Sequence, residues 1–144
     1  FPALITGRWR ELGVHGGFVA GIGAGFAYNT CPLMNGHWLP PEIFMIEPWY
    51  LNFFNNMATV QFDHRLGAWL LALLVPWFWM RARREALTPR AKFAIDLLPV
   101  ILALQIGLGI ATLLLVVPVP LAAAHQGGAV LLLGAALFAN HSLR

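Results

Sequence analysis

Four long apolar segments limit what this sequence can fold into, and they cover about residues 12–28, 57–80, 93–117 and 121–140. A helix of about 20 apolar residues crosses the ~30 Å hydrocarbon core of a bilayer. In lipid, a segment of this length must be helical to satisfy its own backbone groups. Charged residues make up only 10% of the chain, whereas soluble domains carry about a quarter. The expected fold is an all-α membrane protein, a four-transmembrane-helix bundle with residues 1–144 in a single domain.

The start of the chain fits this pattern least well. The first apolar segment is short and rich in glycine, and the polar run TGRWRE precedes it at residues 6–11. The chain also begins with Phe1 rather than with methionine. We expect residues 1–11 to be truncated or irregular, and the chain to be a fragment or an incomplete reading frame.

The loops between the segments differ sharply in charge. Residues 81–92 carry five basic side chains, whereas residues 29–56 contain neither lysine nor arginine. Because cytoplasmic loops are enriched in these residues, we expect 81–92, Arg8, Arg10 and Arg144 on the cytoplasmic or matrix side and 29–56 outside. The formal net charge of +3 then reflects membrane topology, and no nucleic-acid partner is expected.

The outer loop 29–56 is rich in aromatic residues and prolines, which is typical of a segment at the membrane interface. We expect a short interfacial helix within 47–56, with Trp49 and Phe53 one turn apart and facing lipid or a cofactor edge. The single cysteine, Cys31, excludes an internal disulfide and a multi-cysteine metal site.

Two histidines share one local pattern and one depth. His64 begins HRLGA and His125 begins HQGGA, so each has small residues one turn further along its own helix face. His64 lies sixteen residues from Met80, and His125 lies sixteen from His141, which places both near the outer surface, roughly 24 Å above the inner end. Small residues allow a helix or a flat ligand to approach closely. We therefore expect a binding cavity between the two histidines, with a floor that consists of Gly67, Ala68, Gly128 and Ala129.

The second and fourth segments run in the same direction, so they would occupy diagonal corners of an up-down bundle. Neighbouring axes lie ~8–10 Å apart, which leaves roughly 13 Å on the diagonal for two imidazoles and a macrocycle. Axial histidines on bundle helices suit heme iron, whereas zinc needs more ligands. We predict that the Nε2 atoms of His64 and His125 face each other about 4 Å apart, across the iron. The alternative is that both histidines only pack and form hydrogen bonds.

Arg65 and Asp63 flank His64 at the outer rim. The guanidinium of Arg65 suits the carboxylate of a heme propionate. Alternatively, Arg65 extends to lipid headgroups or pairs with Glu47 or Asp63. Asp63 is expected to face solvent.

Other polar residues in the apolar segments are expected to be structural. Gln105, Gly109 and Thr112 form a polar and small stripe that favours contact between helices. Asp96 follows Lys92 by four residues and is expected to pair with it on the helix surface.

Several motifs together carry a family resemblance. The motifs that carry this resemblance are AGFAYNT at 24–30, PLM at 32–34, VQF and HR within 60–65, and AHQ at 124–126. Through them the chain resembles the C-terminal half of heme A synthase, in its proteobacterial and mitochondrial form. The resemblance covers about residues 19–144. It implies a multi-pass protein of a bacterial or mitochondrial inner membrane, built of two four-helix halves that each offer a histidine pair.

The resemblance also implies an activity. Heme A synthase is an oxidoreductase that oxidises the C8 methyl group of heme O to the formyl group of heme A. Its C-terminal pair binds a heme b cofactor, and His64 and His125 match that pair. Heme O is then the substrate, and the expected partners are membrane lipid, heme O synthase, an electron donor and a second copy of the chain.

The chain departs from the family pattern in ways that bear on catalysis. The N-terminal half, associated with the substrate heme and the catalytic glutamate, is absent. Where that half has a glutamate three residues before its first histidine, this chain has Gln61, which is neither acid nor base at neutral pH. The catalytic residues are therefore unknown. Two hypotheses stay open beside a heme-b-binding half: a stand-alone b-type cytochrome, and a purely structural bundle.

Overall fold

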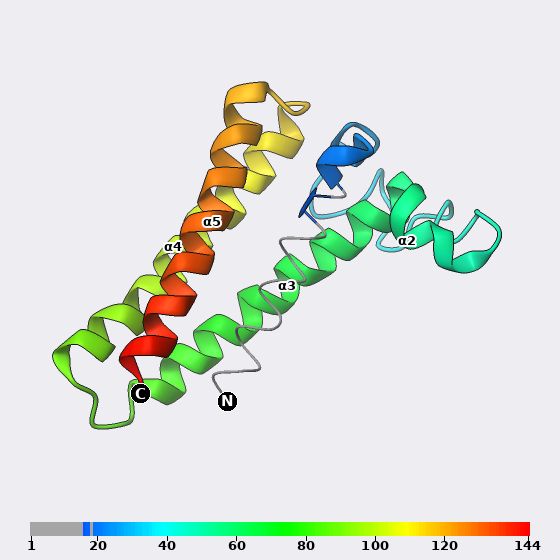
Figure 1. Ribbon diagram of the computed structural model, residues 1–144. Helices are drawn as coiled ribbons and strands as arrows, with labels where there is room; N and C mark the ends of the chain where they lie inside the picture. Colours follow the sequence, from blue (N-terminus) through cyan, green and yellow to red (C-terminus); the bar gives the residue numbers. More distant parts are fainter. Residues whose placement is uncertain (1–15, 18) are drawn as a thin grey trace.

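The computed structural model describes residues 16–17 and 19–144, and this part of the chain is mostly helical (Figure 1). The elements with defined bounds are the 3-10 helices η1 (Ala24–Phe26) and η2 (Trp49–Leu51) and the α-helices α2 (Asn52–Asn55), α3 (Met57–Ala82), α4 (Pro89–Leu114) and α5 (Val119–Ser142). Within the described residues there is no strand, only an isolated bridge between Met34 and His37. The expectations for residues 1–11, including Arg8 and Arg10, lie outside the described residues.

The helices that the sequence predicts after residue 56 are confirmed. α3, α4 and α5 begin and end within four residues of the predicted segments. The short helix expected within 47–56 is present as η2 followed by α2. The prediction that the first segment stays helical to residue 28 is wrong. Its helical residues stop at Gly21, and η1 follows after a turn. Gly23 has a φ of 66°, a left-handed conformation that ends helices.

Side-chain caps fix where α3 and α4 begin. Asn56 Oδ1 accepts hydrogen bonds from the backbone N–H groups of Ala58 and Thr59, at 2.9 and 3.3 Å. Thr88 Oγ1 accepts one from the N–H of Ala91 at 3.2 Å. These bonds satisfy N–H groups that the first turn of a helix leaves without a partner.

Replacing Asn56 by alanine is expected to lower the free energy of unfolding by about 1–2 kcal/mol, because it removes the N-cap of α3. Asn56 Nδ2 also donates to the backbone oxygen of Glu42 at 2.8 Å, so the outer loop loses a contact as well. Thermal unfolding followed by helical circular dichroism measures the loss. Asn55→Ala, at the exposed neighbouring position, is the control, and an equal loss in both variants would contradict the capping role.

The long helices are arranged around α4. α4 and α5 pack side by side as an antiparallel hairpin, joined by the short link 115–118, and α3 lies at an angle to this hairpin (Figure 1). α3 packs against α4 less extensively than α5 does, and contacts between α3 and α5 are few. α4 therefore lies between the other two, and α3 and α5 are diagonal to each other, as expected for the first and third of three successive bundle helices.

The hairpin has a buried inner side and an apolar outer side. Ile95 and Leu98 of α4 belong to one buried core with Ala136 of α5, whereas Leu104 and Val130 are 65% and 70% exposed. Among the described residues, α4 and α5 are long and apolar enough to cross a membrane. α3 is equally long, but three adjacent ionisable residues and three tryptophans make it less apolar. The crossing of all four segments stays a prediction.

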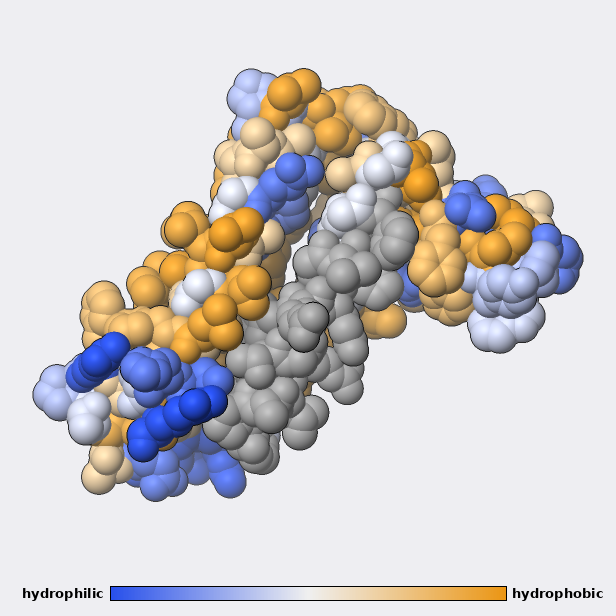
Figure 2. All heavy atoms as spheres, in the orientation of Figure 1, coloured by the Kyte–Doolittle hydropathy of each residue, from blue (hydrophilic) through white to orange (hydrophobic). Residues whose placement is uncertain are grey.

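Polar and basic side chains gather at the end of the bundle where α3 ends and α4 begins (Figure 2). The C-terminus lies at this end too (Figure 1). Here Asp96 accepts hydrogen bonds from Arg83 Nη1 at 2.7 Å and from Trp79 Nε1 at 2.8 Å. The predicted pair of Asp96 with Lys92 is therefore wrong, because Asp96 points across to α3 rather than along its own helix.

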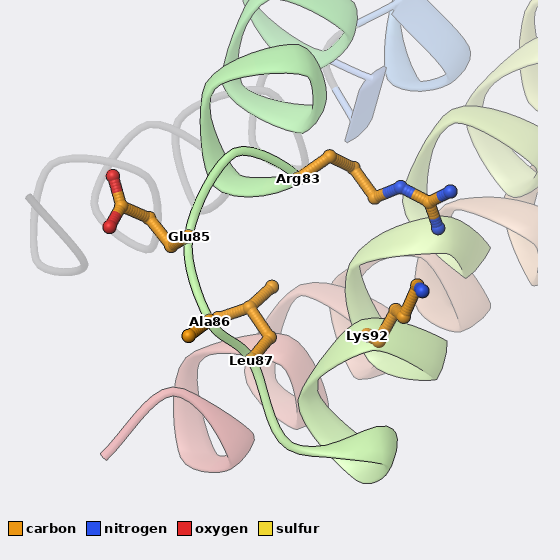
Figure 3. A pocket seen from close by; sticks show the side chains of 5 residues that line it. All are labelled: Arg83, Glu85, Ala86, Leu87 and Lys92. Carbon is orange, nitrogen blue, oxygen red and sulfur yellow. The ribbon is translucent and has the colours of Figure 1, made fainter.

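The loop between α3 and α4 borders a pocket of about 220 Å³ (Figure 3). Its lining residues are Arg83, Glu85, Ala86, Leu87 and Lys92. The pocket begins nineteen residues after His64, which corresponds to roughly 28 Å of helix. It lies at the opposite end of α3 from the predicted histidine site and is no part of that site.

Candidate functional site

His64 of α3 and His125 of α5 lie next to each other. Their ring centroids are 6.2 Å apart, and the ring planes are inclined at 88°. His64 is the eighth residue of α3 and His125 the seventh of α5, so they stand at similar depth in helices that run in the same direction. α3 and α5 make few contacts, and the two imidazoles lie against each other between them.

The spacing of the two rings suits a shared iron ion. Two imidazoles that bind one iron have ring centres about 6 Å apart, because each Fe–N bond is about 2 Å long and each ring centre lies about 1 Å behind its nitrogen. Perpendicular ring planes would be compatible with such an ion as well, since an imidazole can turn about a metal–nitrogen bond. Among the described residues no group of three His, Cys, Asp or Glu side chains gathers. The pair therefore places two imidazoles side by side at a spacing that would accommodate one metal ion between them.

α4 contributes no histidine but supports His125. A Cβ atom added to Gly109 would lie 2.8 Å from Cε1 of His125, closer than real Cβ atoms come. Gln105, one turn earlier on the same face, donates from Nε2 to the backbone oxygen of His125 at 2.8 Å. The predicted role of these two residues in helix contact is confirmed. Thr112 differs, because its hydroxyl donates to Leu108 of its own helix.

The small residues expected to floor the site have different surroundings. Gly128 lies against Gln105, whose amide oxygen fills the space that a Cβ at this position would need. Gly67 and Ala68 are half-buried, and Ala129 is exposed. The missing side chain of Gly128 thus lets α4 approach α5 at the level of His125.

The matched substitutions Gly128→Ala and Gly127→Ala test this contact. A methyl group at 128 must displace the Gln105 amide, which breaks its hydrogen bond to His125 at a cost of about 1 kcal/mol. An added Cβ at Gly127 meets nothing within 4 Å, so this variant is expected to gain up to about 1 kcal/mol from the helix preference of alanine. Thermal unfolding in detergent compares the two, and equal stabilities would show that the contact contributes nothing.

Arg65 fastens the outer loop to α3. Its Nη1 donates to the backbone oxygens of Pro32 and Leu33, both at 3.3 Å. Its Nη2 donates to the backbone oxygen of Tyr28 and to Gln61 Oε1, both at 3.0 Å. An arginine has five N–H groups, so four are directed to protein oxygens. Only the buried Nε–H has no partner among the described residues.

Gln61 belongs to the same attachment. Its side chain is 3% exposed and donates to the backbone oxygens of Ala24 at 2.7 Å and Tyr28 at 3.3 Å. From the sequence, Gln61 stood out only as the replacement of a family glutamate. Its spacing of four residues from Arg65, on one helix face, is the signal that indicates this second role.

Further contacts hold the outer loop in place. Asn29 Nδ2 donates to the backbone oxygen of Leu113 at 2.9 Å, at the end of α4. The Tyr28 hydroxyl donates to Glu42 at 2.7 Å, and this hydrogen bond holds the pKa of the Glu42 carboxyl below its usual range. Asp63, expected to face solvent, is instead half-buried. The loop lies beside the start of α3 (Figure 1).

Known proteins resemble this chain over most of its length. The family model described as cytochrome oxidase assembly protein, COX15-CtaA, matches residues 12–137. The heme A synthase of Nitrosospira multiformis is 67% identical over 144 residues, which is 100% of this chain and 40% of the relative. The heme A synthase COX15 of Arabidopsis thaliana is 44% identical over 131 residues, which is 91% of this chain and 29% of the relative. That of Bos taurus is 43% identical over 129 residues, or 90% and 31%.

The matches cover nearly all of this chain but only a minor part of each relative. This chain spans about two fifths or less of the length of these curated relatives. No solved structure matches it. Since the family match covers far more than half of the residues, the chain belongs to the cytochrome oxidase assembly protein family that includes the heme A synthases.

Proposed function

We propose that this chain is the heme-b-binding half of a heme A synthase. The enzyme would oxidise the C8 methyl group of heme O to the formyl group of heme A. The observation that carries the proposal is the His64–His125 pair, whose centroid spacing of 6.2 Å is compatible with the ~6 Å of two imidazoles on one iron, within a chain that matches the family over residues 12–137.

The residues around the pair have separate roles in this proposal. His64 and His125 would be the axial ligands of heme b. Gly67 and Gly128 would allow close approach beside them, Gly128 through its contact with Gln105. When bound with two histidine ligands, a heme supplies one-electron transfer. The catalytic residues would lie outside this pair.

Arg65 would act at the rim of the site. Three of its hydrogen bonds hold the backbone of Tyr28, Pro32 and Leu33, and a fourth joins Gln61 on α3, which leaves Nε–H for a heme propionate. Its main contribution would be to keep the loop fixed over the outer end of α3. This role requires the planar fork of a guanidinium, because one side chain must reach several carbonyl oxygens at once.

The proposal includes a membrane topology and a set of partners. The basic loop 81–92 would lie on the cytoplasmic or matrix side, and the histidine pair near the outer face of a bacterial or mitochondrial inner membrane. Heme O would be the substrate of the whole enzyme. Heme O synthase, an electron donor and a second copy of the chain would be its protein partners.

An absorption spectrum of the purified full chain tests heme binding. Expressed in a host that makes heme b, the chain should show the sharp reduced α and β bands of a six-coordinate, low-spin heme. A chain that purifies folded but without these bands would overturn the proposal in favour of a structural bundle.

A second experiment tests the enzyme assignment. A longer relative, such as the Nitrosospira heme A synthase, of which this chain spans 40%, has its matching region replaced by this chain and is expressed with a source of heme O. Extracted hemes are then separated by chromatography. Heme A in the extract supports the assignment. Heme b alone, at wild-type protein levels, would leave a stand-alone b-type cytochrome as the better description.

A further inference from the structure

Among the described residues, no hydrogen bond from Nδ1 fixes the direction of the His125 ring. Metal-binding histidines almost always donate the N–H that faces away from the metal to a carboxylate, a carbonyl or a water. Nδ1 of His125 is buried, and no hydrogen-bond partner for it lies among the described residues. Among the described residues, packing contacts therefore remain to set the direction in which this ring points.

α4 supplies such a contact at Gly109. The position of a Cβ atom on Gly109 is 2.8 Å from Cε1 of His125, 3.3 Å from Nε2 and 3.4 Å from Nδ1. The Cε1 corner of the ring thus lies closest to the bare backbone of Gly109. Real Cβ atoms essentially never come within 3.0 Å of another heavy atom, so any side chain at this position would push the ring away.

Gln105 fixes the backbone of the same histidine. It lies four residues before Gly109, on the same face of α4. Its Nε2 donates to the backbone oxygen of His125 at 2.8 Å, and its side chain is 9% exposed. One face of α4 therefore holds both the main chain and the ring of a residue on α5.

We propose that Gly109 and Gln105 are positioning residues for the axial ligand His125, so that α4 sets the ring orientation although it supplies no ligand itself. This inference rests on the proposed function, because it assumes that His125 binds heme iron. Partners that orient a ligating histidine typically change metal affinity about 10–100-fold when they are altered. The same size of effect is expected here, by steric contact instead of a hydrogen bond.

The test compares Gly109→Ala with Gly107→Ala in the heme-loaded full chain. Both substitutions add one methyl group to α4, two residues apart, but an added Cβ at Gly107 meets nothing within 4 Å. Heme affinity is measured by transfer to apomyoglobin, and ligand orientation by the electron paramagnetic resonance of the oxidised low-spin heme. Gly109→Ala should bind heme about 10–100-fold more weakly and shift the resonance. Gly107→Ala should leave both unchanged.

Helix content and elution in detergent separate a local effect from misfolding. A folded Gly109→Ala chain with wild-type affinity and resonance would overturn the proposal. If this variant does not fold, Gln105→Met decides, since it removes the hydrogen bond to His125 without adding an atom beside the ring. A shifted resonance in Gln105→Met supports the proposal, and an unchanged one overturns it. A wild-type chain that binds no six-coordinate heme overturns the proposed function itself, and this inference with it.

Discussion

Replacing either His64 or His125 by alanine is expected to abolish the six-coordinate heme spectrum. In the proposed site each substitution would remove one of two axial ligands, and His64 and His125 belong to no group of three His, Cys, Asp or Glu among the described residues. Loss of a residue that only hydrogen-bonds to a metal ligand already lowers metal affinity about 10–100-fold. Loss of the ligand itself should lower the affinity further. The heme retained per chain after purification, measured as the pyridine adduct, reports the effect.

His141→Ala is the matched control. His141 lies on the same helix as His125, four helical turns further along, and is exposed. It should keep the wild-type spectrum and heme content. A double variant of His64 and His125 that still holds a low-spin heme would show that the iron binds elsewhere.

Replacing Arg65 by methionine is expected to lower the free energy of unfolding by about 2–3 kcal/mol, because the side chain makes four hydrogen bonds to the outer loop and Gln61. For a chain of this size, such a loss corresponds to a fall in Tm of about 5–10 °C. The outer loop should also become open to protease added from its own side of the membrane. Thermal unfolding and limited proteolysis measure these two results.

Arg65→Lys separates the hydrogen-bond geometry from the charge. Lysine keeps the positive charge but lacks the planar fork, so it should restore little of the stability. If Arg65→Lys instead has the wild-type free energy of unfolding, Arg65 acts through its charge, as expected if its main partner is a heme propionate. Heme content measured on the same samples completes the comparison.

The helices after residue 56 could be predicted closely because membrane segments are defined by length and apolar character alone. α3, α4 and α5 follow the apolar runs within four residues. The end of the first segment could not be predicted as well. It is fixed by the single left-handed residue Gly23, and glycines in an apolar run also occur where helices pack closely.

The histidine pair could be predicted from two local patterns at equal depth, whereas the contacts around it could not. Three of the four partners of Arg65 are backbone oxygens, and a backbone acceptor cannot be recognised from the type of its side chain. For Gly109 and Gly128, the sequence indicates close packing but not the neighbour. The neighbour depends on the rotation of α4 against α5, which only the structure provides.

The placement of the histidine pair and the basic loop at opposite ends of α3 has an electrical consequence. With the basic loop on the inner side of the membrane, the nineteen residues from His64 to Arg83 put roughly 28 Å of helix between the site and that side. A charge that crosses the whole membrane potential changes energy by about 2.3 kcal/mol per 100 mV. An electron delivered from the outer face would cross little of this field, and its arrival would not depend on voltage. An electron delivered from the inner side would cross most of the field, so the energised state of the membrane would drive reduction of the site.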